Sequence, residues 1–370
     1  MFSSLRGFLN RHKKKFLVTS VVIGGGALAI NYGQRKLREW QERETRNFLD
    51  MTRKKQHFES TERTCTHTIL SLAPAVCEAV TNALDTQEIL NQLRSNPVNK
   101  VQLWEELKVL TFARVTSMVY AFTILVVTLR IQLNIIGGYL YKDSTNTDSQ
   151  SVISSDLQQK YLSLCHYFVN EGIEKLCRQI ESKVRSVVQS IPLKQKLSLK
   201  ETEQIFWSIQ TAMCVDNADP LKKMASYLIE ESNTDEELFK KLLNETLDLL
   251  ESEEVGTLST SSVSRGLALL VDQIAEFFGP VTPPNGKLSI MELDPQQGTS
   301  NGSSSKSQLN FVNVNNIELP LAKLIPIING LVSQPLGRGL SGVPDVTMQQ
   351  LILNDKLKVL GANIYESFSC

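Results

Sequence analysis

The sequence is poor in the side chains that build metal and catalytic centres. Its 370 residues include only four histidines, and one of them, His12, lies in a short basic tail. Cys65-x-His67 and Cys165-His166 bring cysteine and histidine together, but only one or two positions apart. Side chains at that spacing on a helix point roughly 100–200° away from each other, so neither pair can converge on one metal ion. We therefore predict no metal site and no cofactor.

Motifs of the common enzyme classes are missing as well. The chain has no nucleophile elbow, no Walker loop and no helical His-Glu-x-x-His. Residues 337–342 (GRGLSG) match a dinucleotide-binding fingerprint as a string, but we expect no strand before them and expect Pro344 to prevent a helix after them. We predict that the protein is not an enzyme and has no small-molecule substrate. The competing hypothesis, a helical enzyme that uses Cys165 or His166, predicts that Cys165→Ala abolishes turnover and leaves partner binding intact.

An excess of charge of either sign is lacking too, since 39 Lys and Arg balance 39 Asp and Glu. The balance hides an asymmetry, because residues 1–60 hold 13 of the basic residues and only 5 of the acidic ones. A basic N-terminal segment therefore precedes a mildly acidic body, which argues against nucleic acid as a partner. The six cysteines show no framework spacing, which indicates reduced thiols in a reducing compartment.

Runs of alternating β-branched residues are too short for a sheet, which predicts an all-α fold. Apolar residues recur instead at helical spacing along most of the chain. Ser154 is predicted to cap one helix, and Ser198-x-x-Glu201 and Thr234-x-x-Glu237 are capping boxes that begin two more. Further helices are expected at about 35–84, 85–93, 97–141, 154–191, 261–278 and 345–368, and the apolar segment 319–332 is expected to return to the same core.

The chain is organised around the stretch from Pro97 to Tyr141. An apolar stripe at helical spacing opens it (residues 103, 104, 107 and 110), and Lys108 with its acidic neighbours 105 and 106 is expected on a solvated face. From Val115 to Leu129 the stretch becomes apolar on every side, which is typical of a helix in the centre of a bundle or in a membrane. Gly137-Gly138 is predicted to end the helix.

The length of this apolar run favours a bundle core over a membrane span. Fifteen uncharged residues extend about 22 Å, short of a hydrocarbon core of about 30 Å. Hydroxyl side chains such as Thr116, Ser117 and Thr123 dilute the run further. The alternative that stays open is a polytopic structural membrane protein with a second span near 115–136. A soluble monomeric fragment from about residue 41 onward would exclude it.

The N-terminal region predicts a membrane anchor. Residues 1–15 are basic and end in Arg11-His12-Lys13-Lys14-Lys15, and an uncharged run long enough to span a bilayer follows at about 16–33. A cleaved signal peptide is the competing interpretation, because Ala27-Leu28-Ala29 resembles a cleavage site. That site lies inside the apolar run and a long charged helix follows it, so we favour the anchor. Residues 34–370 would then form one elongated helical bundle, with a disordered surface loop at 280–316 that is rich in Gly, Pro, Ser, Asn and Gln.

Trp104 is the residue that points to interaction chemistry. It lies just inside the start of the central helix, between Lys100 and Leu107. A tryptophan in the core would need a buried acceptor for its indole N–H. An indole near a helix end, beside an apolar stripe and a lysine, equally suits the floor of a groove that accepts a partner helix. Spacing alone leaves both interpretations open.

Several segments across the chain carry a family resemblance. The most specific are Trp104-Glu105-Glu106-Leu107-Lys108, residues 129–139 (LRIQLNIIGGY) and Leu319-Pro320-Leu321-Ala322-Lys323. Weaker matches are RHKKK (11–15), QERE (41–44), HFES (57–60) and RTC (63–65). Together these segments resemble the family of peroxisomal biogenesis factor three, the third peroxin, in its animal form.

The resemblance implies a peroxisomal membrane protein with an N-terminal anchor in the membrane lipids and a helical bundle that faces the cytosol. The family docks peroxin nineteen, the soluble import receptor and chaperone that delivers newly made peroxisomal membrane proteins, by holding one of its helices in a hydrophobic groove. The basic cluster would help targeting, through Arg11, Lys13, Lys14 and Lys15. Carried onto matching positions, the groove would be lined or rimmed by Leu93, Lys100, Trp104, Leu107 and Lys323.

Overall fold

The computed structural model describes residues 2–145, 153–215, 219–229, 236–278, 317–332 and 342–370. The chain divides into two compact units, residues 1–60 and 61–370. The predicted loop at 280–316 and the glycine-rich string at 337–341 lie outside the described residues. The expectation that Pro344 prevents a helix is wrong. Helix α11 begins at Val343 with the proline in its first turn, where the N–H that proline lacks would have no partner within the helix.

The first unit is a single helical segment, the N-terminal part of α1 (Phe2–Ala83). The side chains of residues 2–31 and of Gly33 lie outside the described ones, so the anchor over 16–33 stays a prediction. From Gln34 to Asp50 every side chain is exposed, including those of Leu37, Trp40 and Phe48. This confirms the solvated helix predicted after residue 35.

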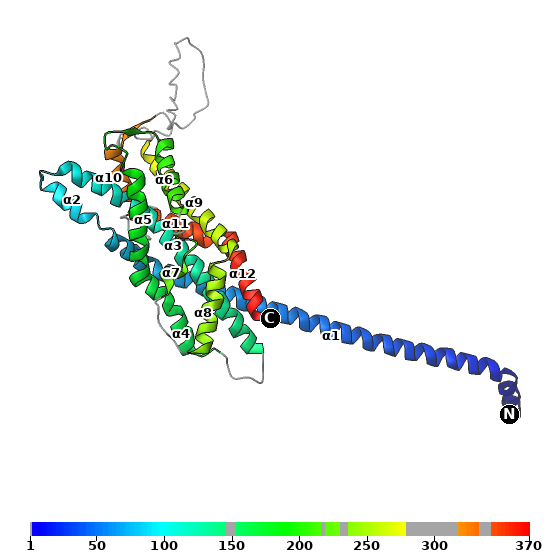
Figure 1. The fold of residues 1–370 in the computed structure, drawn as a ribbon. Helices are drawn as coiled ribbons and strands as arrows, with labels where there is room; N and C mark the ends of the chain where they lie inside the picture. Colours follow the sequence, from blue (N-terminus) through cyan, green and yellow to red (C-terminus); the bar gives the residue numbers. More distant parts are fainter. Residues whose placement is uncertain (1, 146–152, 216–218, 230–235, 279–316, 333–341) are drawn as a thin grey trace, which may run out of the picture. The chain divides into compact units, whose positions relative to one another are not determined.

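The second unit is an all-α bundle, as the sequence predicted (Figure 1). It contains the last turns of α1 and one pair of two-residue strands, β1 (Lys196–Leu197) and β2 (Leu319–Pro320), in antiparallel register. The described helices that follow α1 are α2 (Gln87–Arg94), α3 (Lys100–Thr145), α4 (Ser155–Tyr167), the π-helical η1 (Phe168–Gly172), α5 (Ile173–Val188), α6 (Leu199–Cys214), α7 (Ala225–Leu228), α8 (Glu237–Leu250), α9 (Glu253–Ala275), the 3-10 turn η2 (Glu276–Phe278), α10 (Leu321–Val332), α11 (Val343–Leu353) and α12 (Asp355–Ser369).

Helix α3 forms the centre of this unit. Every residue from Thr111 to Gly138 is buried, and α12, α5, α10, α9 and α11 pack around it. Among the described residues α3 is the one helix long and apolar enough to cross a membrane, and its most apolar 18-residue window is 100% buried inside the protein. The helix is therefore part of the core, and the second membrane span near 115–136 is not supported.

The prediction that Gly137-Gly138 ends α3 is wrong, because the helix continues to Thr145. The two glycines allow close packing of neighbouring helices instead. A Cβ added at Gly137 would lie 2.8 Å from Thr61 Cγ2 of α1, and one added at Gly138 would lie 2.6 Å from Phe368 Cβ of α12. Both distances are far inside van der Waals contact, so only glycine lets α1 and α12 approach α3 this closely.

Two of the three predicted capping signals are confirmed, and the third, at Thr234, stays a prediction. The Ser154 hydroxyl accepts a hydrogen bond from the backbone N–H of Leu157, and Ser198 with Glu201 forms a complete capping box at the start of α6. Thr234 lies outside the described residues, and α8 begins at Glu237. These bonds satisfy N–H groups that the helix itself leaves unpaired.

Three predicted helices have different limits in the structure. The stripe over 154–191 is interrupted by η1, where Gly172 packs directly against the backbone of α7. Helix α9 starts at Glu253 and not near Ser261, because Ser252 caps it there. The final segment divides into α11 and α12 at Asn354, whose side chain accepts from Lys356 N and caps the second helix. In each case a packing contact or a cap overrides the apolar periodicity.

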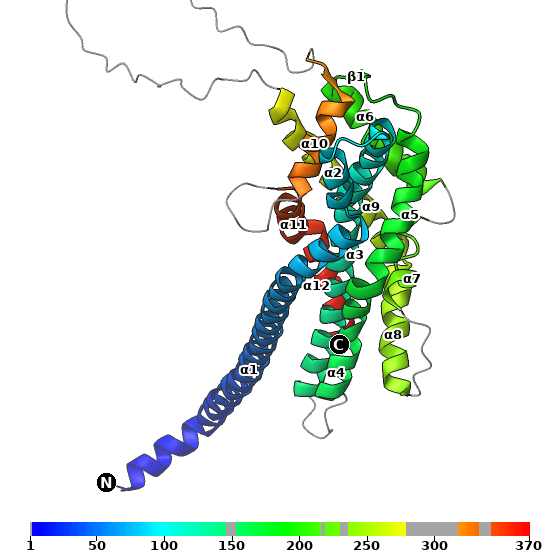
Figure 2. The same cartoon turned by 90° about the vertical axis from the view of Figure 1, so that its left-hand side faces the viewer.

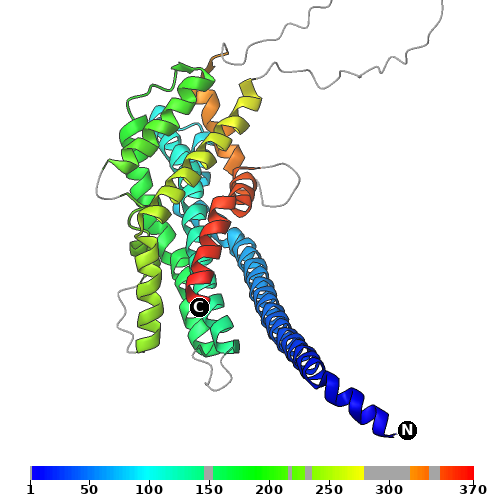
Figure 3. The same cartoon turned by 90° about the vertical axis from the view of Figure 1, so that its right-hand side faces the viewer.

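The helices of this unit distribute between two ends. Helices α2, α10 and α6 lie at one end with β1 and β2, and α4 and α8 lie at the other (Figures 1 and 2). On another face α9, yellow in Figure 3, crosses between α6 and the C-terminal helices, in contact with α6, α11 and α3. The end that carries α2 and α10 also carries the residues singled out by the sequence.

Candidate partner-binding site

The five predicted groove residues come from three helices that meet at one end of the bundle. Leu93 lies on α2, Lys100, Trp104 and Leu107 lie on the first turns of α3, and Lys323 lies on α10. Helices α2 and α10 both contact α3. The structure therefore places all five on elements that pack together, although they span 230 positions of sequence.

The turn between α2 and α3 positions the first wall of this end. Asn96 has a left-handed backbone with φ of 59°, a conformation that asparagine tolerates better than most residues. Helix α2 has no fully buried residue of its own. It rests on the core through the half-buried side chains of Ile89, Leu90 and Leu93. Its inner face is thus apolar and its attachment is shallow.

Trp104 is neither a buried core residue nor a fully exposed one. Its side chain is half-buried and packs against the core, while Leu107, one turn further on, is only 1% exposed. Lys100 and Lys323 are exposed. Leu107 therefore belongs to the core that supports Trp104, and the two lysines are placed to meet charge on an approaching molecule.

Two apolar residues at this end were not singled out by the sequence. Val98 is fully exposed and Val101 is 71% exposed, although valine is one of the residue types most often buried. Neither falls on the stripe of residues 103, 104, 107 and 110 that defines the amphipathic start of α3. Only their position outside that stripe, next to Pro97, could have drawn attention to them.

The structure corrects the prediction for Lys108, since its side chain is fully buried and not on a solvated face. Its Nζ lies 2.5 Å from Glu105 Oε2 and donates to the backbone carbonyl of Ile191 at 2.8 Å. The ammonium is therefore paired and hydrogen-bonded, which is what a buried charge requires. The sequence pattern put Lys108 on the polar face of the helix with its acidic neighbours. In the folded bundle other helices cover that face as well.

A charged contact flanks the same region of α3. Arg185 of α5 donates two hydrogen bonds to Glu106, at 2.8 and 2.7 Å, and one to Glu181 at 2.7 Å. The hydrogen bonds that Arg185 donates lower the pKa of the Glu106 carboxyl, and the same bonds to Glu106 and Glu181 raise the pKa of Arg185. This paired geometry fixes the first turns of α3 against α5.

A buried polar cluster surrounds Arg114, ten residues after Trp104 on α3. Arg114 of α3 is 3% exposed and donates to Thr81 Oγ1 at 3.1 Å, Thr86 Oγ1 at 3.0 Å and Asn329 Oδ1 at 3.3 Å. The Thr86 hydroxyl also donates to Asn329 Oδ1 at 3.2 Å. One guanidinium therefore connects the end of α1, the residue before α2, and α10.

The described residues contain no group of three or more His, Cys, Asp or Glu that would hold a metal ion. Cys165 is buried and its thiol donates to Gln132 Oε1 at 3.0 Å, while His166 is exposed. Cys65 is buried and His67 is exposed. As the spacing predicted, neither pair converges. Burial raises the pKa of Cys165 to about 12, so its thiol is a poor nucleophile at neutral pH.

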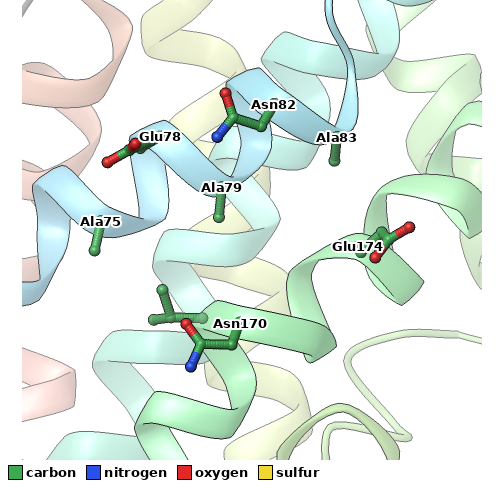
Figure 4. Close-up of a pocket in the computed structure, with 8 residues that line it drawn as sticks. Ala75, Glu78, Ala79, Asn82, Ala83, Asn170 and Glu174 are labelled. Carbon is green, nitrogen blue, oxygen red and sulfur yellow. The ribbon is translucent and has the colours of Figure 1, made fainter.

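A surface groove of about 610 Å³ lies elsewhere in the unit, between α1 and the η1–α5 region. Ala75, Ala79 and Ala83 of α1 lie on one side and Asn170 and its neighbours on the other (Figure 4). None of the five predicted groove residues lines it. Small apolar and exposed polar side chains make up the lining, so it is an open depression in the surface.

The targeting residues Arg11, Lys13, Lys14 and Lys15 lie on the backbone of α1, but their side chains are outside the described ones. Their role stays a prediction.

Comparison with known proteins gives consistent matches along the whole chain. The family model described as Peroxin-3 matches residues 7–101, 94–144 and 138–367. Peroxisomal biogenesis factor 3 of Rattus norvegicus is 36% identical over 389 residues, which cover 100% of this chain and 98% of the relative. The Homo sapiens protein of the same name is 35% identical over 392 residues with the same coverage. Peroxisome biogenesis protein 3-1 of Arabidopsis thaliana is 26% identical over 324 residues, or 79% of this chain. The full-length match and the identity above 30% show that the chain belongs to the Peroxin-3 family.

Proposed function

We propose that the protein is a docking receptor of the peroxisomal membrane that binds a helical segment of peroxin nineteen and so supports the insertion of peroxisomal membrane proteins. The names of the relatives, peroxisomal biogenesis factor 3, support the peroxisomal role. The observation that carries the docking role is the half-buried Trp104 at the end of the bundle where α2, α3 and α10 meet. The function is binding, with no catalytic step.

The chemistry of this end suits an amphipathic helix. A partner helix presents apolar side chains at i, i+3, i+4 and i+7, and the receptor answers with a few large apolar side chains. Trp104 and Leu93 offer half-buried apolar surface, and the exposed Val98 and Val101 extend it. Lys323 and Lys100 would then lie at the rim, where a charge contributes more to the rate of association than to its strength.

The membrane role follows from the N-terminal region. Residues 16–33 would anchor the protein in peroxisomal membrane lipids, residues 1–15 would help direct it there, and residues 34–370 would face the cytosol. This orientation places the docking end where a soluble receptor can reach it.

The test is Trp104→Ala, measured for thermal stability and for binding of the helical peroxin nineteen peptide. A tryptophan at a groove floor is a hot spot whose truncation costs about 2 kcal/mol or more, roughly 30-fold in affinity. We expect binding to be largely lost with a near-native melting temperature. Lys100→Ala and Lys323→Ala should be milder and should reduce the salt dependence of the association rate.

Trp207→Ala is the matched control. Trp207 lies on α6 and is 50% exposed, and it is not among the predicted groove residues. The control should bind the peptide as the wild type does. If Trp104→Ala were strongly destabilised, or stable and still tight-binding, Trp104 would be a core or bystander residue and the groove would lie elsewhere.

A further inference from the structure

The buried cluster around Arg114 is placed to control the geometry of the proposed groove. Its three hydrogen-bond acceptors come from three places in the chain. Thr81 lies in α1, Thr86 is the residue before α2, and Asn329 lies in α10. Arg114 itself lies on α3, ten residues after Trp104. The helices that carry Leu93 and Lys323 are thus tied to the same side chain of the central helix.

The hydroxyl of Thr86 binds Arg114 and Asn329 and does not cap the helix that follows it. Thr86 occupies the N-cap position of α2, yet its side chain makes no capping hydrogen bond to that helix. Its hydroxyl points instead to Arg114 and Asn329, and the neighbouring Asp85 carboxylate accepts the hydrogen bond from the backbone N–H of Gln87. Thr86 is fully buried, whereas α2 has no buried residue. Besides the half-buried contacts of Ile89, Leu90 and Leu93, α2 is therefore attached by one fully buried residue at its N-terminal end.

The choice of an arginine is also informative. The side chains that accept its hydrogen bonds are all neutral, and its Nε has no partner in the described structure. Burial lowers the pKa of Arg114, and the charge of the nearby Asp85 offsets this only in part, so the buried guanidinium is poor evidence for a stabilising role. A guanidinium, however, offers several donors in a rigid planar fork and so fixes the directions of three oxygens at once, whereas the three donors of a lysine rotate on a flexible stem.

We propose that Arg114 is a positioning residue for the docking groove: through Thr86 and Asn329 it sets the separation of α2 and α10, the two walls between which the partner helix lies. The proposal rests on the proposed function. It assigns Arg114 no contact with the partner, since the side chain is buried.

The experiment compares Thr86→Val with Thr81→Val in the full-length protein, using the helical peroxin nineteen peptide as the probe. Each variant removes one hydroxyl that accepts from the same guanidinium, but Thr86 adjoins a groove wall and Thr81 lies in α1. Both should lower the melting temperature, since Thr86→Val deletes two buried hydrogen bonds, with Arg114 and Asn329, and Thr81→Val deletes one partly buried bond with Arg114. Thr86→Val should also weaken peptide binding by roughly five- to tenfold and speed hydrogen exchange of the amides of α2, whereas Thr81→Val should change neither. These results would support the proposal.

The proposal is overturned if Thr86→Val binds the peptide as tightly as the wild type, or if Thr81→Val weakens binding and loosens α2 to the same degree. The second result would mean that only general stability is at work. Trp104→Ala measured in the same series separates this from the proposed function. If Trp104→Ala loses binding while Thr86→Val retains it, only the role of Arg114 fails. If Trp104→Ala retains binding, the groove itself is wrong and the role of Arg114 falls with it.

Discussion

Arg130 and Glu62 form an ion pair inside the bundle, with Arg130 Nη1 2.6 Å from Glu62 Oε2. The guanidinium side chain is 1% exposed and the carboxylate 17%. Arg130 also donates to the backbone carbonyl of Ile352 at 3.2 Å, and Asn134 donates to the other carboxylate oxygen at 3.2 Å. A single charged pair thus joins α1, the central helix α3 and the end of α11.

Removing the acidic partner of this pair should destabilise the bundle strongly. Glu62→Ala leaves the buried Arg130 charge without its carboxylate, and breaking a buried pair from one side typically costs about 3–5 kcal/mol. Denaturant unfolding monitored by circular dichroism would measure the loss. Glu236→Ala is the control, because its pair with Lys160 at 3.2 Å is about 40% exposed on both sides and should cost at most about 1 kcal/mol. Equal losses would contradict the structural role of the Arg130–Glu62 pair.

A methyl group at Gly138 should push α12 away from α3. The added Cβ would lie 2.6 Å from Phe368 Cβ and 2.9 Å from the Phe368 carbonyl carbon, so Gly138→Ala should cost about 1–3 kcal/mol or more by overpacking. Gly330→Ala in α10 is the matched control. A Cβ there meets nothing within 4 Å, and replacing glycine by alanine in a helix should raise stability by about 0.5–1 kcal/mol. The opposite signs should appear as opposite shifts in melting temperature.

Three buried thiols and the half-buried thiol of Cys77 predict how stability responds to alkaline pH. Burial raises the pKa to about 12 in each of Cys65, Cys77, Cys165 and Cys177. An unfolded thiol ionises near about 8.5, so between that value and about 12 the unfolded chain binds fewer protons than the folded one. The protonated thiols therefore contribute fully to the stability of the folded protein below about pH 8.5. As the pH rises through this window, the free energy of unfolding falls by at most about 1.4 kcal/mol per pH unit for each thiol.

Unfolding at pH 8 and at pH 10 would measure this slope, and Cys165→Ala should make it shallower. In the native protein at pH 8 a thiol reagent should label Cys214 and Cys370, which are exposed, well before the other four. Rapid labelling of all six cysteines without denaturant would contradict the burial.

The anchor prediction is tested by deleting residues 1–33. If the run at 16–33 is the membrane-spanning segment, the shortened protein should be soluble in the cytosol, because the apolar part of α3 is already covered by other helices. The measurement is extraction of membranes with alkaline carbonate, with the full-length chain as the control. A truncated chain that stays in the membrane pellet would mean that another part of the protein is membrane-embedded.

Local signals in the sequence determined which segments are helical and which residues form the core, but not every helix end. Ser154 and Ser198 specify helix starts through their own side chains, and the uncharged run from Val115 to Leu129 specifies a helix that must be covered on every side. Such features depend on neighbours within a few positions, so they can be recognised in the sequence without knowledge of the tertiary structure. The elements that carry Leu93 and Trp104 were located in the same way.

Only the tertiary structure decided what those elements do together. The sequence of Gly137-Gly138 predicts a helix end, but in the structure Thr61 and Phe368, which are distant in sequence, pack against the two glycines. Lys108 reads as solvated until the Ile191 carbonyl covers it. The meeting of α2, α3 and α10 depends on contacts across more than 200 positions, and no periodicity records which buried oxygens Arg114 will find. Local patterns encode which residues a helix must bury, but the partner that buries each one is set by how the whole chain packs.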